Sequence, residues 1–142
     1  MLKGLELAPF FIALKNTKKI GDTAEIKFML LSMELGHIVS KPITENTRYD
    51  LIIDTGEELQ RIQIKSTNRK VINRNVYFYK CSFCYGSSHK EHYKANDIDY
   101  IAVYIFPEDA WYKIPFKAIE GKTGKFYPNR KPESSKYEQF RL

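Results

Sequence analysis

Two short runs set the architecture of this chain: RYDLIID at residues 48–54 and RIQIK at residues 61–65. The first run has an apolar centre, and the second alternates Ile62 and Ile64 with polar residues. Alternation with a period of two is typical of a strand that buries one face. The turn at residues 54–57 contains Asp and Gly, which favour tight connections. The sequence therefore predicts that the two runs form an antiparallel hairpin.

The other expected elements follow from apolar spacing and from the residues that end each run. Ala24, Phe28 and Leu31 recur at helical spacing before Gly36, which predicts an amphipathic helix. Runs rich in β-branched and aromatic residues predict further strands. The expected set is a helix at 21–35, strands at 37–40, 49–54, 59–65, 76–84, 100–106 and 111–114, and a helical turn from Pro115. A polar turn is expected before residue 76, and a loop or surface arm over 122–142.

Length and composition indicate one ordinary domain. The chain has 142 residues, 43% of them hydrophobic, which is enough for a single core. The longest apolar-rich run, residues 5–14, contains Pro9 and is shorter than the roughly 20 residues that a membrane span needs. The start of the chain lacks the pattern of a secretory signal. We therefore expect a cytoplasmic, intracellular protein without membrane contact, whose two cysteines are reduced.

Basic residues are concentrated in one part of the chain. Between Arg61 and Lys94 there are eight basic residues and one acidic residue, Glu91, so this segment carries a charge of +7. The net charge of the whole chain is +6, so the rest is nearly neutral. Such a local patch predicts a polyanionic partner. The aromatic residues between the charges either stack on bases or form the inward face of a strand: Tyr77, Phe78, Tyr79, Phe83, Tyr85 and Tyr93.

The predicted hairpin gathers residues with hydrolytic chemistry. Asp50 opens the first strand, and Gln63 and Lys65 project from one face of the second. A carboxylate, an amide oxygen and an ammonium group can therefore converge at one end of the hairpin. Mg²⁺ takes oxygen ligands, and a nearby lysine can orient water and offset phosphate charge. The alternative interpretation of this spacing is a half-buried hairpin with one polar side.

In its wider context this pattern resembles the PD-(D/E)XK nuclease superfamily, most closely its small group I intron homing endonuclease-like group with an RYDLI…QxK signature. The likeness spans about residues 16–119, and it is carried by Gly21, Glu25, Gly36, Pro42, residues 48–52, residues 63–65 and DYIAVY at 99–104. The resemblance implies an α/β, restriction-endonuclease-like core with a mixed sheet flanked by helices. It also implies a Mg²⁺-dependent endodeoxyribonuclease that hydrolyses phosphodiester bonds of duplex DNA.

The resemblance also implies roles for individual residues. Asp50 resembles the principal metal ligand, Lys65 the active-site lysine, and Glu25 the helix acid that closes the metal site. Gln63 occupies the usual acidic position of the motif, and it removes one negative charge from the site. The predicted catalytic residues are these four, and the predicted metal ligands are Asp50, Gln63 and Glu25. The expected cofactor is Mg²⁺, with Mn²⁺ as the alternative.

DNA is the expected partner. The predicted phosphate contacts are Arg48, Arg69, Lys70, Arg74 and Lys80. Because cutting both strands of a duplex needs two active sites, a homodimer or homotetramer is expected. We divide the chain into an N-terminal arm (1–15), a nuclease domain (16–121) and a basic C-terminal tail (122–142).

Three alternatives remain open at this point. A Holliday junction or branched-DNA resolvase of the same superfamily would prefer junctions to linear duplex. A catalytically disabled nucleic-acid-binding protein on the nuclease scaffold would bind DNA without nicking it. A zinc site would use Cys81, Cys84, His89 and His92. Against zinc, both cysteines lie in a strand-like run, where a separation of three points them to opposite faces.

Overall fold

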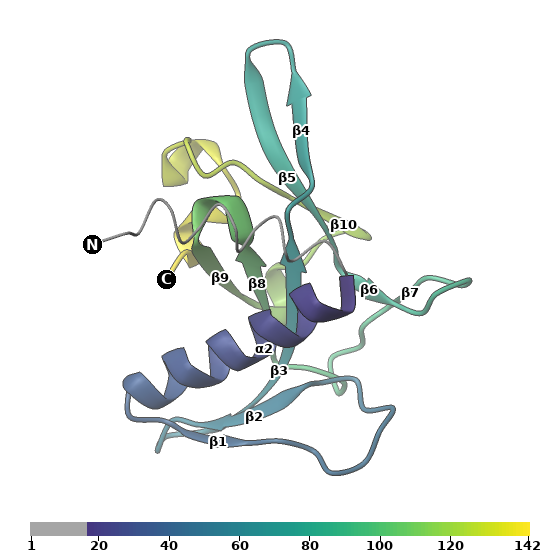
Figure 1. Cartoon of the computed structure of the whole chain (residues 1–142), viewed down its shortest axis with the longest axis vertical. Coiled ribbons are helices and arrows are strands. Elements are labelled where there is room, and N and C mark those ends of the chain that lie inside the picture. The colour runs from purple at the N-terminus through teal and green to yellow at the C-terminus, as the bar shows by residue number, and fades with distance from the viewer. Residues whose placement is uncertain (1–16) are drawn as a thin grey trace.

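A five-stranded mixed sheet forms the centre of the computed structural model, which describes residues 17–142 (Figure 1). The expected N-terminal arm of residues 1–15 lies outside them. The strands in spatial order are β1 (Ile38–Ser40), β2 (Leu51–Asp54), β3 (Leu59–Thr67), β8 (Tyr100–Ile105) and β9 (Ala110–Pro115). β3 and β8 run parallel, and the other neighbours are antiparallel. The predicted hairpin is β2–β3, so the prediction is confirmed.

Helix α2 (Thr17–Glu34) lies across this sheet and contacts β1 and β3 (Figure 1). Its buried residues Ala24 and Phe28 share one core cluster with Ile62 and Ile64 of β3. Burying a large apolar side chain such as Phe28 or Ile62 contributes about 1.5–3 kcal/mol to stability. Gly36 follows the helix with a φ of 83°, and its N–H donates to the carbonyl of Met33 in the last turn, as expected for a glycine that ends a helix.

A second sheet projects from the central one. It contains β4 (Lys70–Asn73), β5 (Val76–Ser82) and β10 (Thr123–Phe126), antiparallel in the order β10-β5-β4. The β4–β5 hairpin extends away from the body of the molecule (Figure 1). The polar turn predicted before residue 76 is confirmed at Arg74 and Asn75, but β4 was not predicted; pairing with β5 supplies its backbone hydrogen bonds although most of its side chains are exposed. A small ribbon of β6 (Cys84–Tyr85) and β7 (Glu91–His92) completes the strands.

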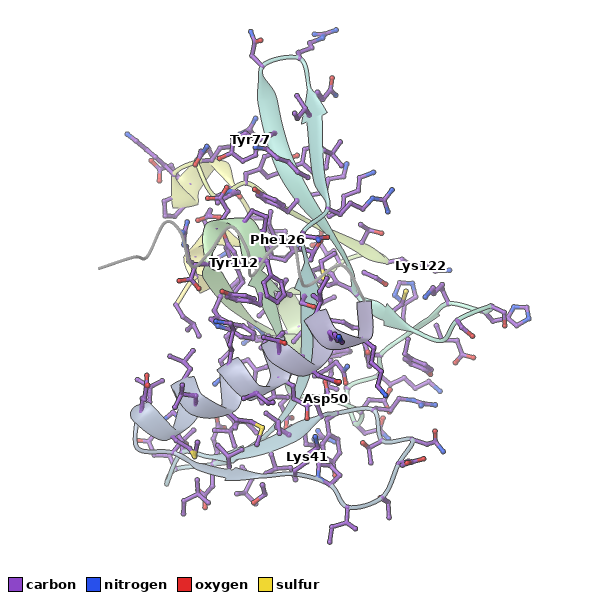
Figure 2. All side chains as sticks on the ribbon, viewed as in Figure 1. Lys41, Asp50, Tyr77, Tyr112, Lys122 and Phe126 are labelled. Atoms are coloured by element: carbon purple, nitrogen blue, oxygen red, sulfur yellow. The ribbon has the colours of Figure 1, made fainter. Side chains whose placement is uncertain are left out.

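The C-terminal segment is part of the core. Phe126 of β10 is fully buried, Tyr137 is buried, and both belong to the cluster that contains Tyr112 of β9. The ring centroids of Tyr112 and Phe126, both labelled in Figure 2, lie 4.8 Å apart. The prediction of a loop or surface arm over 122–142 is therefore wrong for these aromatic residues. Four 3₁₀ turns lie along the second half of the chain: η1 (Phe106–Glu108), η2 (Phe116–Ala118), η3 (Pro132–Ser134) and η4 (Glu138–Phe140).

Among residues 17–142, no helix combines the length and the apolar character that crossing a bilayer requires.

Candidate active site

Asp50 directly precedes β2 and is hydrogen-bonded to the neighbouring strand β3. Its N–H donates to the carbonyl of Ile62 at 2.8 Å, and its Oδ2 accepts a hydrogen bond from the N–H of Ile64, also at 2.8 Å. The hairpin register aligns Leu51 with Ile62, so the residue before Leu51 lies beside the middle of β3. The carboxylate of Asp50 is therefore held in a fixed position against the strand that carries Gln63 and Lys65.

Gln63 and Lys65 emerge on the face of β3 opposite to α2. Their neighbours Ile62 and Ile64 are buried in the cluster under the helix, and successive side chains of a strand point to opposite faces. The Gln63 side-chain Nε2 donates to the carbonyl of Ile64 at 3.4 Å. The Lys65 Nζ donates to the carbonyl of Cys84 at 3.0 Å and lies 5.6 Å from the centre of the Tyr93 ring.

These side chains line one pocket of about 280 Å³. Asp50, Gln63 and Lys65, which the sequence predicted to converge, all contribute to its wall, together with Arg48. The remaining lining residues come from the end of β5, from the β6–β7 ribbon and from the loop before β2: Thr47, Ser82, Cys84, Tyr85, Gly86, Lys90 and Tyr93. The pocket thus combines one carboxylate, one amide and several cations.

Burial disfavours both of the opposite charges in this pocket. Burial raises the pKa of Asp50 above its ordinary value, and the charge of Glu25 adds to the rise, while the N–H of Ile64 and the charge of Lys65 oppose it. Burial also lowers the pKa of Lys65, against the opposing effects of Cys81, Asp50 and Cys84. A cation that entered beside Asp50 would therefore relieve an unfavourable negative charge.

Glu25 lies outside the pocket wall. Its carboxylate forms an ion pair with Lys41, whose side chain is exposed (Figure 2 labels Lys41). It is nevertheless near enough for its charge to raise the pKa of Asp50. The structure therefore brings Asp50, Gln63 and Lys65 together and leaves Glu25 beside them, engaged by another residue.

The pocket also contains contacts that sequence reasoning missed. The carbonyl of Cys84 holds Lys65, the guanidinium of Arg48 lies 4.0 Å from the centre of the Tyr85 ring, and Lys90 donates to the carbonyl of Gly86 at 2.6 Å. A backbone carbonyl acting as an acceptor leaves no signal in a sequence. The aromatic residues interleaved with the basic patch were the only available hint of Tyr85 and Tyr93.

The zinc alternative is wrong for the part of the chain that the structure describes. Within residues 17–142, no three His, Cys, Asp or Glu side chains converge as metal ligands. Both cysteines are buried, and burial raises the pKa of the Cys81 thiol to about 12.

The predicted phosphate contacts fall into two groups. Arg48 lines the pocket, whereas the other four residues lie on or beside the β4–β5 hairpin: Arg69, Lys70, Arg74 and Lys80. The aromatic residues of the basic segment are mainly structural, since Phe78, Tyr79, Phe83 and Tyr93 are buried.

Comparisons with known proteins bear on the fold of this chain. A family model described as PD-(D/E)XK endonuclease matches residues 15–139. Among solved structures, the bacterial homing endonuclease I-Ssp6803I matches with a TM-score of 0.70 and 23% identity, over 89% of this chain and 88% of that chain. Hjc from Archaeoglobus fulgidus, a Holliday junction resolvase from an archaeal hyperthermophile, matches with a TM-score of 0.48 and 15% identity, over 76% of this chain and 84% of that chain. A search of curated proteins found no match. The first structural likeness confirms the predicted α/β, restriction-endonuclease-like core.

Proposed function

Because the chain belongs to the PD-(D/E)XK endonuclease family, we propose that it is a homing-endonuclease-like enzyme that hydrolyses phosphodiester bonds of duplex DNA with Mg²⁺. One observation carries this proposal: Asp50, Gln63 and Lys65 line a single pocket on the β2–β3 hairpin. The description of I-Ssp6803I as a homing endonuclease supports the choice of duplex DNA as substrate.

The donor atoms in the pocket suit a hard cation. Of the two carboxylate oxygens of Asp50, Oδ2 accepts the Ile64 N–H, and no hydrogen bond among residues 17–142 engages Oδ1. The side chain of Gln63 uses its amide nitrogen internally, so its Oε1 remains the atom for a ligand. Oxygen donors of this kind fit Mg²⁺, with Mn²⁺ as the alternative. Glu25 would supply a third oxygen once Lys41 releases it.

When bound, Mg²⁺ would polarise the scissile phosphate and lower the pKa of a coordinated water. The protein's own contribution begins with Asp50, which is held in place by two backbone bonds and so needs little reorganisation to bind. Lys65 is fixed by the Cys84 carbonyl and the Tyr93 ring, and its ammonium group would orient the attacking water and offset phosphate charge. Arg48, stacked on Tyr85, would hold an adjacent phosphate.

Nicking of supercoiled plasmid tests the proposal. We expect the wild-type chain to nick plasmid with Mg²⁺ and not with EDTA, and we expect Asp50→Ala and Lys65→Met to lower the rate at least about 100-fold. Lys113→Met is the matched control. Lys113 lies in the same sheet, burial lowers its pKa too, and it donates to Gln60 outside the pocket. We expect this control to retain the wild-type rate.

Each failure has a distinct meaning. DNA binding without Mg²⁺-dependent nicking would assign the chain to the disabled, binding-only class, for which the amide of Gln63 would be the cause. Nicking that survives Lys65→Met would remove the lysine from the mechanism. Cleavage of a four-way junction at a higher rate than cleavage of linear duplex would assign the chain to the resolvases instead.

We further propose that two or four copies assemble, since breaking both strands needs two active sites. Light scattering of the purified full chain, alone and with DNA, should give the mass of a dimer or tetramer. A monomeric mass in both conditions, with double-strand breaks formed in one binding event, would contradict this.

A further inference from the structure

The β4–β5 hairpin extends away from the body of the molecule (Figure 1) and contains no acidic residue of its own, although the carboxylate of Glu108 accepts hydrogen bonds from the hydroxyls of Tyr77 and Tyr79 on β5. Asn73 pairs with Val76, so the loop between the strands has only two residues, Arg74 and Asn75. Asn73, Arg74 and Asn75 are all exposed. No Asp or Glu occurs from residue 61 to residue 90. The tip of the hairpin therefore offers two amides and one guanidinium to a polyanion.

The conformation of Arg74 is unusual for its residue type. It is the first residue of the two-residue loop and has a φ of 56°, in the left-handed region that favours glycine. Within residues 17–142, no hydrogen bond or ion pair engages its guanidinium. The fold thus places an arginine where glycine would adopt the backbone conformation with less strain, although the arginine side chain makes no hydrogen bond or ion pair within residues 17–142. A residue held in a backbone conformation that its type disfavours is a candidate for a role in binding.

Cations on both sides of the tip are held in place by aromatic rings. Lys70 lies 4.0 Å from the centre of the Tyr77 ring, and Arg130 lies 4.5 Å from that of Tyr127. Arg74 and Arg130 share a cleft of about 330 Å³, which is lined by Asn73, Arg74, Val76, Phe78, Tyr127 and Arg130. Because the rings restrict these side chains before binding, less conformational entropy is lost when they meet phosphates.

We propose that the β4–β5 hairpin enters the major groove of duplex DNA as a two-stranded ribbon, with Arg74 reading base edges while Lys70 and Arg130 contact the flanking phosphates. The major groove, about 12 Å wide, admits a β-ribbon, and arginine pairs with guanine through two hydrogen bonds. Asn73 and Asn75 have the amide chemistry that recognises adenine. This inference rests on the proposed action on duplex DNA, and it adds the surface that selects the sequence.

The length of β5 gives the distance between the hairpin tip, which would contact bases, and the pocket, where the phosphodiester bond would be hydrolysed. β5 runs from the hairpin tip to Ser82, which lines the pocket of Asp50. Its seven residues, at about 3.3 Å each, span roughly 23 Å, which corresponds to about seven base pairs of B-DNA. Figure 2 labels Tyr77, the second residue of β5, and Asp50 of the pocket, and the hairpin tip lies beyond Tyr77 on the side away from Asp50. The bases read by Arg74 should therefore lie about seven base pairs from the cut.

Selection from a randomised duplex library tests the inference. The full chain, held in EDTA so that it cannot cut, is incubated with the library, and the bound duplexes are sequenced. We expect the wild type to prefer particular bases and Arg74→Ala to lose the preference at one or two positions by about 5- to 150-fold, with the preferences elsewhere retained. Lys70→Ala should weaken binding to all sequences and lower the salt slope by about one. Lys117→Ala, at an exposed position in a pocket with Glu58 and Asp99, is the control for loss of one positive charge and should change neither.

Arg74→Gly separates recognition from folding. Glycine adopts a positive φ without cost, so this variant should unfold at the wild-type temperature or above it and should still lose the same base preference. Uniform weakening by Arg74→Ala, an unchanged preference, or a wild type without any preference would each overturn the inference. Plasmid nicking by the wild type tests the proposed function independently. A chain that nicks but keeps its preference after Arg74→Ala refutes the reading hairpin alone, and a chain that selects sequences without nicking refutes the catalytic proposal alone.

Discussion

Replacing Asp50 by Asn removes a negative charge from the pocket while it preserves the shape of the side chain. The amide oxygen of Asn can still accept the hydrogen bond that the Ile64 N–H now donates to Asp50 at 2.8 Å. Burial raises the pKa of Asp50, and Glu25 adds to the rise. The folded chain therefore binds a proton at this site more readily than the unfolded chain does. The ionised carboxylate consequently opposes folding in the absence of a cation.

The direction of the pH dependence follows from this shift. Below the ordinary pKa of 3.8 the Asp50 carboxyl is protonated in both the folded and the unfolded chain and does not affect the free energy of unfolding. As the pH rises through the raised pKa of Asp50 in the folded chain, the free energy of unfolding falls. At pH 8 the Asp50→Asn variant should therefore exceed the wild type in free energy of unfolding by about 0.5–2 kcal/mol. For a chain of this length that difference corresponds to a rise in Tm of roughly 2–8 °C. Near pH 3 the two proteins should unfold at the same temperature.

Mg²⁺ should reverse the order of stability. At ten times its Kd, a ligand that binds only the folded state stabilises it by about 1.4 kcal/mol, which the wild type should gain and Asp50→Asn should largely lose. Thermal unfolding followed by circular dichroism, at pH 3 and pH 8 with and without Mg²⁺, measures both effects. Asp54→Asn is the matched control, because Asp54 is the last residue of β2, the strand that Asp50 directly precedes, and it accepts the Gly56 N–H outside the pocket. A lower Tm for Asp50→Asn than for the wild type at pH 8 would contradict the destabilising effect of the ionised Asp50 carboxylate. A full increase in Tm with Mg²⁺ in this variant would show that Asp50 is not the metal ligand.

Three further predictions concern the metal site and the framework that positions it. Gln63→Glu restores an acid to the pocket, and we expect the Mg²⁺ concentration for half-maximal plasmid nicking to fall several-fold, because a second carboxylate strengthens cation binding. The Asp99–Arg61 ion pair lowers the pKa of Asp99 and links β3 to the start of β8, and Asp99→Asn removes this ion pair. Since the pair is about one-third exposed, a loss of about 1 kcal/mol or less is expected in urea unfolding above pH 5, and the difference should vanish as the pH falls through the folded pKa. Gly124→Ala would place a Cβ 2.1 Å from the Phe83 ring, so we expect a Tm lower by several degrees, whereas an unchanged Tm would show that the ring moves aside freely.

Elements with strong local patterns could be predicted from the amino-acid order. The helix before Gly36, the β2–β3 hairpin and the apolar strand β8 each have a period or a run that few other structures share. The spacing of Asp50, Gln63 and Lys65 indicated that they could converge at one end of the hairpin, because hairpin register is a short-range property, and the structure places all three on one pocket wall.

The remaining features depend on contacts between distant segments. β4 is formed by its pairing with β5, and β10 reaches that sheet from about forty residues further along the chain. The wall of the pocket likewise draws on β5, β6 and the loop before β2, and its acceptor for Lys65 is a backbone carbonyl. Residue type and spacing report the preferences of neighbours, whereas burial, hydrogen-bond partners and pKa shifts arise from groups that meet only when the chain has folded. For that reason the convergence of Asp50, Gln63 and Lys65 could be predicted from the sequence, and the electrostatics of the pocket and the engagement of Glu25 by Lys41 could not.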